Sequence, residues 1–277
     1  MVNDIITSLR GLAGLSEKSI LVGKHTIVYL EGGRGESILL LHGFGADKDN
    51  WNLFSKYLTK KYHVIAPDLP GFGESSKIWS DQYTIAAQVE RVHEFAKKTG
   101  LKKFHLVGNS MGGLIPGVYA ATYPDEIPTL GLLDPAGVAG REPNEFSREL
   151  EKGNNPLIVE SVSEYDKLLD FTFFKPPFMP APLKSYFAEI AVQGKDFYKK
   201  VFIEATPGNQ LEAVMARIRA KTLILWGDND RVLSVSSAQV LQEGIQISKV
   251  FILKNCGHMP MLERPEETAR HYLEFIS

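Results

Sequence analysis

The stretch His105-Leu106-Val107-Gly108-Asn109-Ser110-Met111-Gly112-Gly113-Leu114-Ile115 decides how this chain folds. Its apolar start is typical of a buried strand and its end of a helix, so a sharp turn must place Ser110 at the apex. Gly108 and Gly112 leave room for helix and strand to approach closely. Such a turn raises the hydroxyl above the sheet edge, beside a helix N-terminus. A plain glycine-rich turn would look similar, so the interpretation depends on the rest of the chain.

Two later strands also end in reactive groups. Residues 222–225 are apolar and lead into Asp228 and Asp230, and residues 250–253 lead into Cys256 and His258. A serine hydroxyl becomes a nucleophile only with a histidine base and a carboxylate that orients it. Open α/β sheets collect their sites at the carboxyl ends of strands. The order serine, acid, histidine therefore predicts that the three side chains form one catalytic site at that edge.

Four motifs resemble the α/β-hydrolase family, and the resemblance covers about residues 21–277. They are residues 41–45 (Leu-His-Gly-Phe-Gly), residues 68–75, the serine turn, and residues 255–258 (Asn-Cys-Gly-His). Residues 42–51 and 255–265 resemble the branch of monoacylglycerol lipases and bacterial carboxylesterases. The serine turn also resembles the meta-cleavage-product hydrolases, which break carbon–carbon bonds. Family members usually carry the acid three residues past the glycine, which implies Asp230, with Asp228 as a turn former.

The pattern of strands and helices predicts one α/β fold: a mostly parallel eight-stranded sheet with helices on both faces. Residues 19–22 and 26–31 are expected to form a hairpin. Between residues 134 and 219 no strand pattern occurs, which is too long for a loop in a compact core. We therefore expect an inserted helical cap at residues 138–215, between core segments 1–137 and 216–277. The other expected strands are 38–41, 64–66, 104–107, 130–133, 222–225 and 250–253, and the expected helices are 51–60, 85–99, 111–123, 236–242 and 265–275.

Composition and charge argue against one class of partner and against a disulfide. The chain has 277 residues, 31 basic and 33 acidic, without a concentrated basic stripe, so nucleic acid is not an expected partner. A single cysteine rules out an internal disulfide and fits a cytoplasmic protein.

Residues 5–15 have apolar side chains at helical spacing, which predicts a helix docked on the body. The alternative is an interfacial anchor that brings the protein into peripheral contact with a membrane.

The base and the anion hole follow from position in the chain. His258 is the expected base, because Gly257 gives its loop freedom to turn the imidazole toward Ser110. His42 precedes the serine in a loop whose backbone must bind the oxyanion, so its role is structural. The expected oxyanion donors are the backbone N–H groups of Phe44 and Met111. Losing one such donor costs about 3 kcal/mol of barrier.

An unusual segment lies inside the expected cap. Residues 171–182 (Phe-Thr-Phe-Phe-Lys-Pro-Pro-Phe-Met-Pro-Ala-Pro) cannot form a regular amphipathic helix, since proline removes donors and breaks the period. The aromatic side chains either anchor the cap or form an apolar wall over the serine. The candidate pocket residues are Phe173, Phe174, Phe178, Met179 and Met259.

These features predict a serine hydrolase that cleaves carboxylic esters through an acyl-enzyme, with no metal or cofactor. Monoacylglycerols or short- to medium-chain esters, small molecules or lipids, are the expected substrates. Carbon–carbon hydrolases usually carry a cap arginine and a tryptophan after the histidine. Here residues 149–215 contain no arginine and Met259 follows His258. That activity is the first alternative, and a hydrolase-fold ligand receptor with little turnover is the second.

Overall fold

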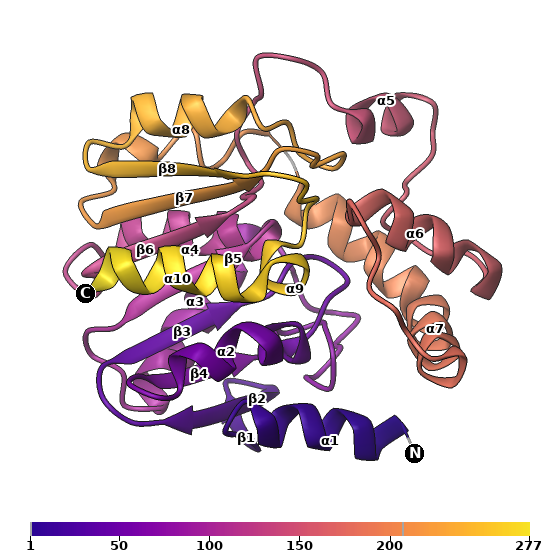
Figure 1. Cartoon of the computed structure of the whole chain (residues 1–277), viewed down its shortest axis with the longest axis horizontal. Helices are drawn as coiled ribbons and strands as arrows, with labels where there is room; N and C mark the ends of the chain where they lie inside the picture. The colour runs from indigo at the N-terminus through magenta and orange to yellow at the C-terminus, as the bar shows by residue number, and fades with distance from the viewer. Residues whose placement is uncertain (1, 207) are drawn as a thin grey trace.

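An eight-stranded sheet forms the body of the protein (Figure 1). The computed structural model describes residues 2–206 and 208–277. Within them the strand order is β1-β2-β4-β3-β5-β6-β7-β8, and only the β1–β2 and β2–β4 pairs are antiparallel. The mostly parallel sheet is therefore confirmed. Its strands are β1 Leu15–Val22, β2 His25–Gly33, β3 Ser37–Leu41, β4 His63–Pro67, β5 His105–Asn109, β6 Thr129–Leu133, β7 Lys221–Gly227 and β8 Ser248–Leu253.

Helices cover both faces of this sheet because the central strands are apolar on both sides. In β3, Leu39 and Leu41 pack with one layer of helices, and Ile38 and Leu40 pack with the other. The first layer is α3 Ile85–Lys98, α4 Met111–Thr122 and α8 Ser237–Gly244. The second is α2 Asn52–Leu58, α9 Pro260–Glu263 and α10 Pro265–Ile276.

The first two strands form the predicted hairpin. Val22 pairs with His25, which leaves Gly23 and Lys24 as the turn. Gly23 has a φ of +56°, a conformation that a residue with a Cβ rarely adopts.

The segment between β6 and β7 contains three α-helices and, among its described residues 134–206 and 208–220, no strand. They are α5 Glu145–Glu151, α6 Tyr165–Thr172 and the long α7 Ala181–Ala205. Figure 1 shows them beside one edge of the body, where the helical insert was expected. Residues 173–180, which contain three of the prolines, link α6 to α7 without a helix.

The N-terminal helix α1, Val2–Leu12, lies against the body near β1 and α2 (Figure 1). Its Arg10 donates two hydrogen bonds to the Asp49 carboxylate, each 2.7 Å long, and also pairs with Glu17 at 2.7 Å. None of the described helices combines the length and hydropathy that a membrane-spanning segment needs.

Candidate active site

Ser110 occupies the turn between β5 and α4 with a strained backbone, at φ +58° and ψ −122°. The two glycines make this turn possible. A Cβ on Gly108 would lie 1.5 Å from the carbonyl oxygen of Gly112, and a Cβ on Gly112 would lie 2.2 Å from that of Leu41. The serine is 9% exposed and lines a cavity beneath the cap. Strain of this kind is typical of functional positions.

His258 and Asp230 are in direct contact although they follow different strands. The His258 Nδ1 lies 2.8 Å from the Asp230 Oδ2, and both side chains are almost fully buried. Trp226 Nε1 donates to the same oxygen at 3.1 Å, and the backbone N–H groups of Val232 and Leu233 donate to Oδ1 at 2.8 and 3.0 Å. His258 and Ser110 line the same cavity, and Nδ1 is the ring nitrogen of His258 that contacts the acid.

The second aspartate of this loop has a different environment. Asp228 accepts hydrogen bonds from the side chain of Asn229, at 2.6 Å, and from the backbone N–H of Cys256, at 3.4 Å. It thus joins the loop after β7 to the loop after β8. Cys256 is fully buried, and burial raises the pKa of its thiol, so a nucleophilic thiolate is disfavoured.

His42 is held as a neutral, structural side chain. Its Nδ1 contacts the Gly43 carbonyl oxygen at 2.8 Å, and its Nε2 accepts the backbone N–H of Leu69 at 2.9 Å. Both ring nitrogens are therefore occupied. Burial lowers the pKa of this imidazole, which agrees with the neutral form.

The expected oxyanion donors border the same cavity. Phe44 follows Gly43, where an added Cβ would lie 3.1 Å from the Ser110 Cβ, and Met111 begins α4 directly after the serine. Across residues 2–206 and 208–277, neither backbone N–H donates a hydrogen bond to another protein group. The ring of Phe44 packs against Phe72, with centroids 5.7 Å apart. Packing by the side chain and donation by the backbone are compatible.

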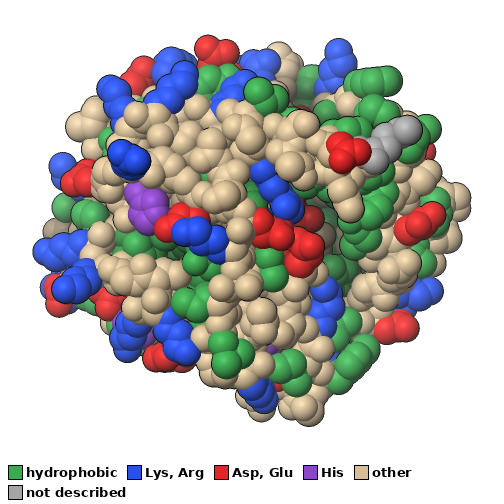
Figure 2. All heavy atoms as spheres, turned by 90° about the horizontal axis from the view of Figure 1, so that it is seen from below, with side chains coloured by type: hydrophobic (Ala, Val, Ile, Leu, Met, Phe, Trp, Pro, Cys, Tyr) green, Lys and Arg blue, Asp and Glu red, His purple; other side chains and the backbone are tan. Residues whose placement is uncertain are grey.

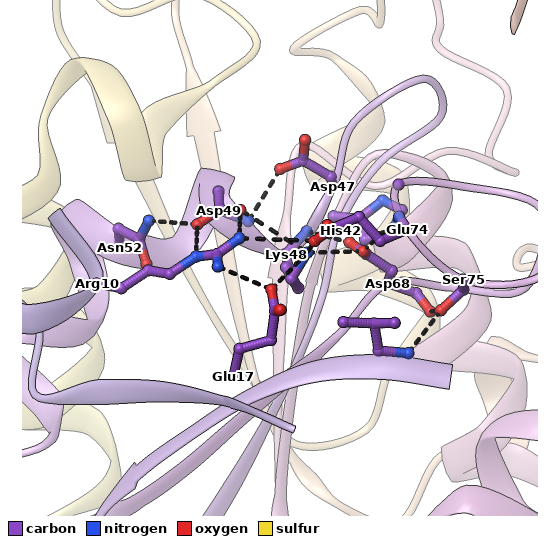
Figure 3. A network of polar contacts seen from close by, with 12 residues as sticks. Arg10, Glu17, His42, Asp47, Lys48, Asp49, Asn52, Asp68, Glu74 and Ser75 are labelled. Atoms are coloured by element: carbon purple, nitrogen blue, oxygen red, sulfur yellow. Dashed lines mark hydrogen bonds and ion pairs between the residues drawn. The ribbon is translucent and has the colours of Figure 1, made fainter. Parts of the chain in front are cut away.

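A network of buried charges supports the loop that carries Phe44 (Figure 3). Lys48 is 2% exposed at its side chain, and its Nζ lies 2.9 Å from the Asp68 Oδ2 and in contact with Glu74. Asp68 also accepts the backbone N–H groups of Lys48, at 2.7 Å, and Glu74, at 2.8 Å. Arg10 and Asp49 extend the network to α1. Asp68 therefore holds the loop after β3 and the loop after β4 together.

Asn109 fixes the serine turn relative to the histidine loop. Its Nδ2 donates to the carbonyl oxygens of His258, at 3.0 Å, and Leu133, at 3.1 Å. The histidine loop is also fastened to the cap, since the His258 N–H donates to the Thr172 carbonyl at 2.8 Å. These bonds restrict how far His258 can move from Ser110.

The cavity has a volume of about 380 Å³ and mainly apolar walls. Three of the five candidate pocket residues line it, namely Phe173, Met179 and Met259. Phe174 and Phe178 do not, which differs from the expectation, and Phe178 is 94% exposed. Phe173 is the extended residue that ends α6, and bends follow at residues 174 and 175. Further walls come from α1 and from the cap helices: Ile5, Ile6, Leu9, Leu168, Leu169, Leu183, Phe187 and Ile190.

Sequence reasoning missed one polar residue of this site. Asp134 follows β6 directly and is fully buried, and one oxygen of each of Asp134 and Asp230 and one nitrogen of His258 lie within 4.8 Å of one another. The available signal was an aspartate at the end of an apolar strand. Asp68 gives the same signal and has a structural role, so position alone does not separate the two.

Comparison with known proteins identifies the family. Residues 36–265 match the family model of the alpha/beta hydrolase fold. The chain is 38% identical to Lipase 1 of Psychrobacter immobilis, over 99% of this chain and 88% of that protein. It is 36% identical to the monoacylglycerol lipase ABHD6 of Rattus norvegicus, over 88% of this chain and 76% of that protein.

Two solved structures are similar over nearly the whole chain. A membrane phospholipase A, described as a bacterial virulence factor, is 48% identical with a TM-score of 0.97, over 99% of this chain and 90% of its own. A meta-cleavage product hydrolase of Pseudomonas fluorescens is 25% identical with a TM-score of 0.79, over 94% and 97%. The serine turn, the sheet order and these matches agree, and the chain belongs to the α/β-hydrolase fold family.

Proposed function

We propose that the protein hydrolyses neutral carboxylic esters with an apolar acyl chain, monoacylglycerols among them, with Ser110 as nucleophile, His258 as base and Asp230 as the orienting acid. That it is an ester-hydrolysing member of its family follows from its lipase relatives, which are 35–38% identical over most of the chain. The observation that carries the residue roles is the 2.8 Å contact between His258 and Asp230 beside a cavity that Ser110 lines.

The reaction has two half-reactions. Ser110 Oγ attacks the ester carbonyl carbon and passes its proton to His258, while the backbone N–H groups of Phe44 and Met111 stabilise the oxyanion. His258 then protonates the leaving alcohol, and the acyl group stays on Ser110. A water molecule gives its proton to His258 and attacks the acyl carbon, and His258 then passes that proton to Ser110 Oγ as the acyl–oxygen bond breaks and the acid leaves. Asp230 keeps the imidazole in the required tautomer throughout.

The shape and polarity of the cavity support esters over the anionic substrates of carbon–carbon hydrolases. Phe173, Met179 and Phe187 present apolar surface to an acyl chain. The central cap, residues 149–215, has no arginine that could bind a substrate carboxylate.

Apolar side chains of α1 and the cap suit a substrate that comes from a lipid surface, and we include peripheral membrane contact in the proposal. Ile5 and Leu9 of α1 lie at the cavity together with the cap, and Leu12 and Phe178 are exposed by 77% and 94%. Figure 2 shows hydrophobic side chains gathered along the hollowed part of this face. Apolar side chains of this kind can enter the interfacial region of a bilayer.

The test is a series of p-nitrophenyl esters with acyl chains of increasing length, assayed with the wild-type protein, Ser110→Ala, and the exposed-serine control Ser8→Ala. We expect Ser110→Ala to lose at least about 1,000-fold in kcat, and the control to stay active. A fluorophosphonate probe should label the wild type and not Ser110→Ala. Full turnover by Ser110→Ala contradicts the proposal. An unlabelled wild type points to a receptor, and turnover of a vinylogous ketoacid alone points to carbon–carbon hydrolysis.

A further inference from the structure

A second carboxyl group lies behind the His258–Asp230 pair, in a position that the backbone fixes. Asp134 is fully buried at the end of β6, with a φ of +44°. Its backbone N–H donates to the Leu225 carbonyl at 2.9 Å, and its Oδ1 accepts the backbone N–H of Gly227 at 2.9 Å. Both bonds join β6 to the strand that leads into Asp230, so the side chain cannot turn away.

The other oxygen of this carboxyl is in an unusual state. Asp134 Oδ2 is buried, and among residues 2–206 and 208–277 no N–H or O–H group donates to it. A buried carboxylate normally accepts hydrogen bonds, because an ionised oxygen without a donor is costly in a water-excluded site. A protonated carboxyl has a different requirement, since its hydroxyl oxygen must donate.

The Gly227 N–H favours the ionised form of Asp134, whereas its carboxyl neighbours favour the protonated form. Four titratable groups face Asp134. From the loops after β7 and β8 these are Asp230, His258 and Cys256, and from α9 it is Glu263. Burial, followed by the charges of Asp230 and Glu263, raises the pKa of Asp134 well above the usual range of a carboxyl. Two carboxyl groups this close cannot both ionise without large repulsion.

The same three side chains are spaced as metal ligands would be, with ligand atoms within 4.8 Å of one another. Their hydrogen bonds argue against that use. Asp230 Oδ2 already receives Trp226 Nε1 and His258 Nδ1, at 3.1 and 2.8 Å. A cation there would compete with the His258 ring for the same carboxylate oxygen.

We infer that Asp134 carries a proton at neutral pH and donates it from Oδ2 to the Asp230 carboxylate, which makes Asp134 a positioning residue for the catalytic acid. The positioning role of Asp134 rests on the proposed function, whereas the presence of a proton on Asp134 does not. The neutral donor holds Asp230 toward His258 without adding a second negative charge. Two ionised carboxylates would stabilise the imidazolium in the resting enzyme, and a histidine that already carries the proton cannot accept the proton of Ser110.

The kinetic test uses a matched pair of variants that both tolerate the positive φ. Asp134→Asn keeps the acceptor for Gly227 and places an N–H₂ donor toward Asp230, and Asp134→Gly removes the donor. On a p-nitrophenyl ester we expect Asp134→Asn to keep kcat within about threefold and to leave the acid limb of the pH–rate profile in place. Asp134→Gly should lose roughly tenfold in kcat at unchanged KM, because a hydrogen bond to a charged group is lost.

The opposite results overturn the inference. If Asp134 were ionised, Asp134→Asn would remove a negative charge beside the histidine and move the acid limb to lower pH by about 1 unit or more. Equal kcat for Asp134→Asn and Asp134→Gly would show that the donor has no effect.

A second readout does not depend on catalysis. Infrared difference spectra at pH 7 compare Ser110→Ala with Ser110→Ala/Asp134→Asn, and a protonated carboxyl has a C=O band separate from the carboxylate bands. We expect the difference spectrum to contain that band from Asp134, because the contribution of Asp47 is common to both proteins and cancels. Its absence overturns the inference even if the enzyme hydrolyses esters, and its presence supports the proton location even if it does not.

Discussion

Replacing Lys48 by methionine tests whether the charge network under the oxyanion loop stabilises the fold. The Lys48 and Asp68 side chains are 2% and 0% exposed, and their Nζ and Oδ2 atoms lie 2.9 Å apart. Methionine fills a similar volume without charge, so the main effect of Lys48→Met is to leave Asp68 as a buried carboxylate without its cation. Breaking a buried pair from one side in this way typically costs about 3–5 kcal/mol.

The structure sets where in this range the cost lies. At an effective dielectric constant of about 20, unit charges 2.9 Å apart attract by roughly 6 kcal/mol, and the desolvation of the ammonium that the variant avoids offsets part of this. Asp68 keeps the backbone N–H donors of Lys48 and Glu74. We therefore expect a loss of about 3 kcal/mol, which is a large share of the roughly 5–15 kcal/mol by which domains are stable.

Urea unfolding followed by tryptophan fluorescence measures this loss. Lys102→Met, at an exposed lysine, is the matched control and should change the unfolding free energy by less than about 0.5 kcal/mol. Lys48→Met/Asp68→Asn should lose less than Lys48→Met alone, because it removes the orphaned charge. If Lys48→Met unfolds at the same urea concentration as the control, the network does not stabilise the fold and the reasoning is refuted.

Three further predictions concern the surroundings of the site. Gly257→Ala should lower kcat/KM at least about tenfold, because its Cβ would lie 2.5 Å from the backbone nitrogen of Phe174 and must displace the histidine loop. The control Gly11→Ala, which has open space around it, should keep wild-type activity in the same ester assay. Burial and neighbouring carboxylates raise the pKa of Asp47 to about 7, so the folded state keeps a proton that the unfolded chain releases above about pH 4. The wild type therefore loses stability between about pH 4 and 7, and Asp47→Asn does not. Thermal melts from about pH 4 to 8 should show the variant gaining stability relative to wild type up to about pH 7, and a constant difference above it. Cys256 should resist iodoacetamide at about pH 8 until the protein is unfolded in urea, and rapid alkylation of the native protein would contradict its raised thiol pKa.

The sheet and its edge could be predicted because their signals are local. Apolar runs of about four to six residues predict buried strands, and the glycines at 108 and 112 predict the turn at Ser110 from steric limits alone. Each strand that ends in a reactive side chain then indicates one group at the carboxyl edge. The order of strands confirms that these ends lie together.

The contacts that tune the site could not be predicted, because they join residues far apart in the chain. Arg10 meets Asp49 across 39 positions, and Asp134 meets Gly227 across 93. No spacing rule connects such pairs. The sequence also could not predict that Phe174 and Phe178 do not line the cavity, since a proline-containing segment has no helical period that would assign its faces.

The backbone strain at Ser110 shows why local and long-range information are both needed at one residue. A non-glycine residue at φ +58° and ψ −122° costs about 1–3 kcal/mol and persists only if its surroundings determine it. Here the Ser110 N–H donates to the Leu133 carbonyl at 3.1 Å, and the Ser110 carbonyl accepts the N–H groups of Gly113 and Ala136 at 2.8 and 3.0 Å. The glycines that permit the turn are visible in the sequence. The bonds to β6 and to the loop after it, which hold the turn in place, come from the same segment that carries Asp134, so the strand that stabilises the strained serine also positions the second carboxyl behind His258.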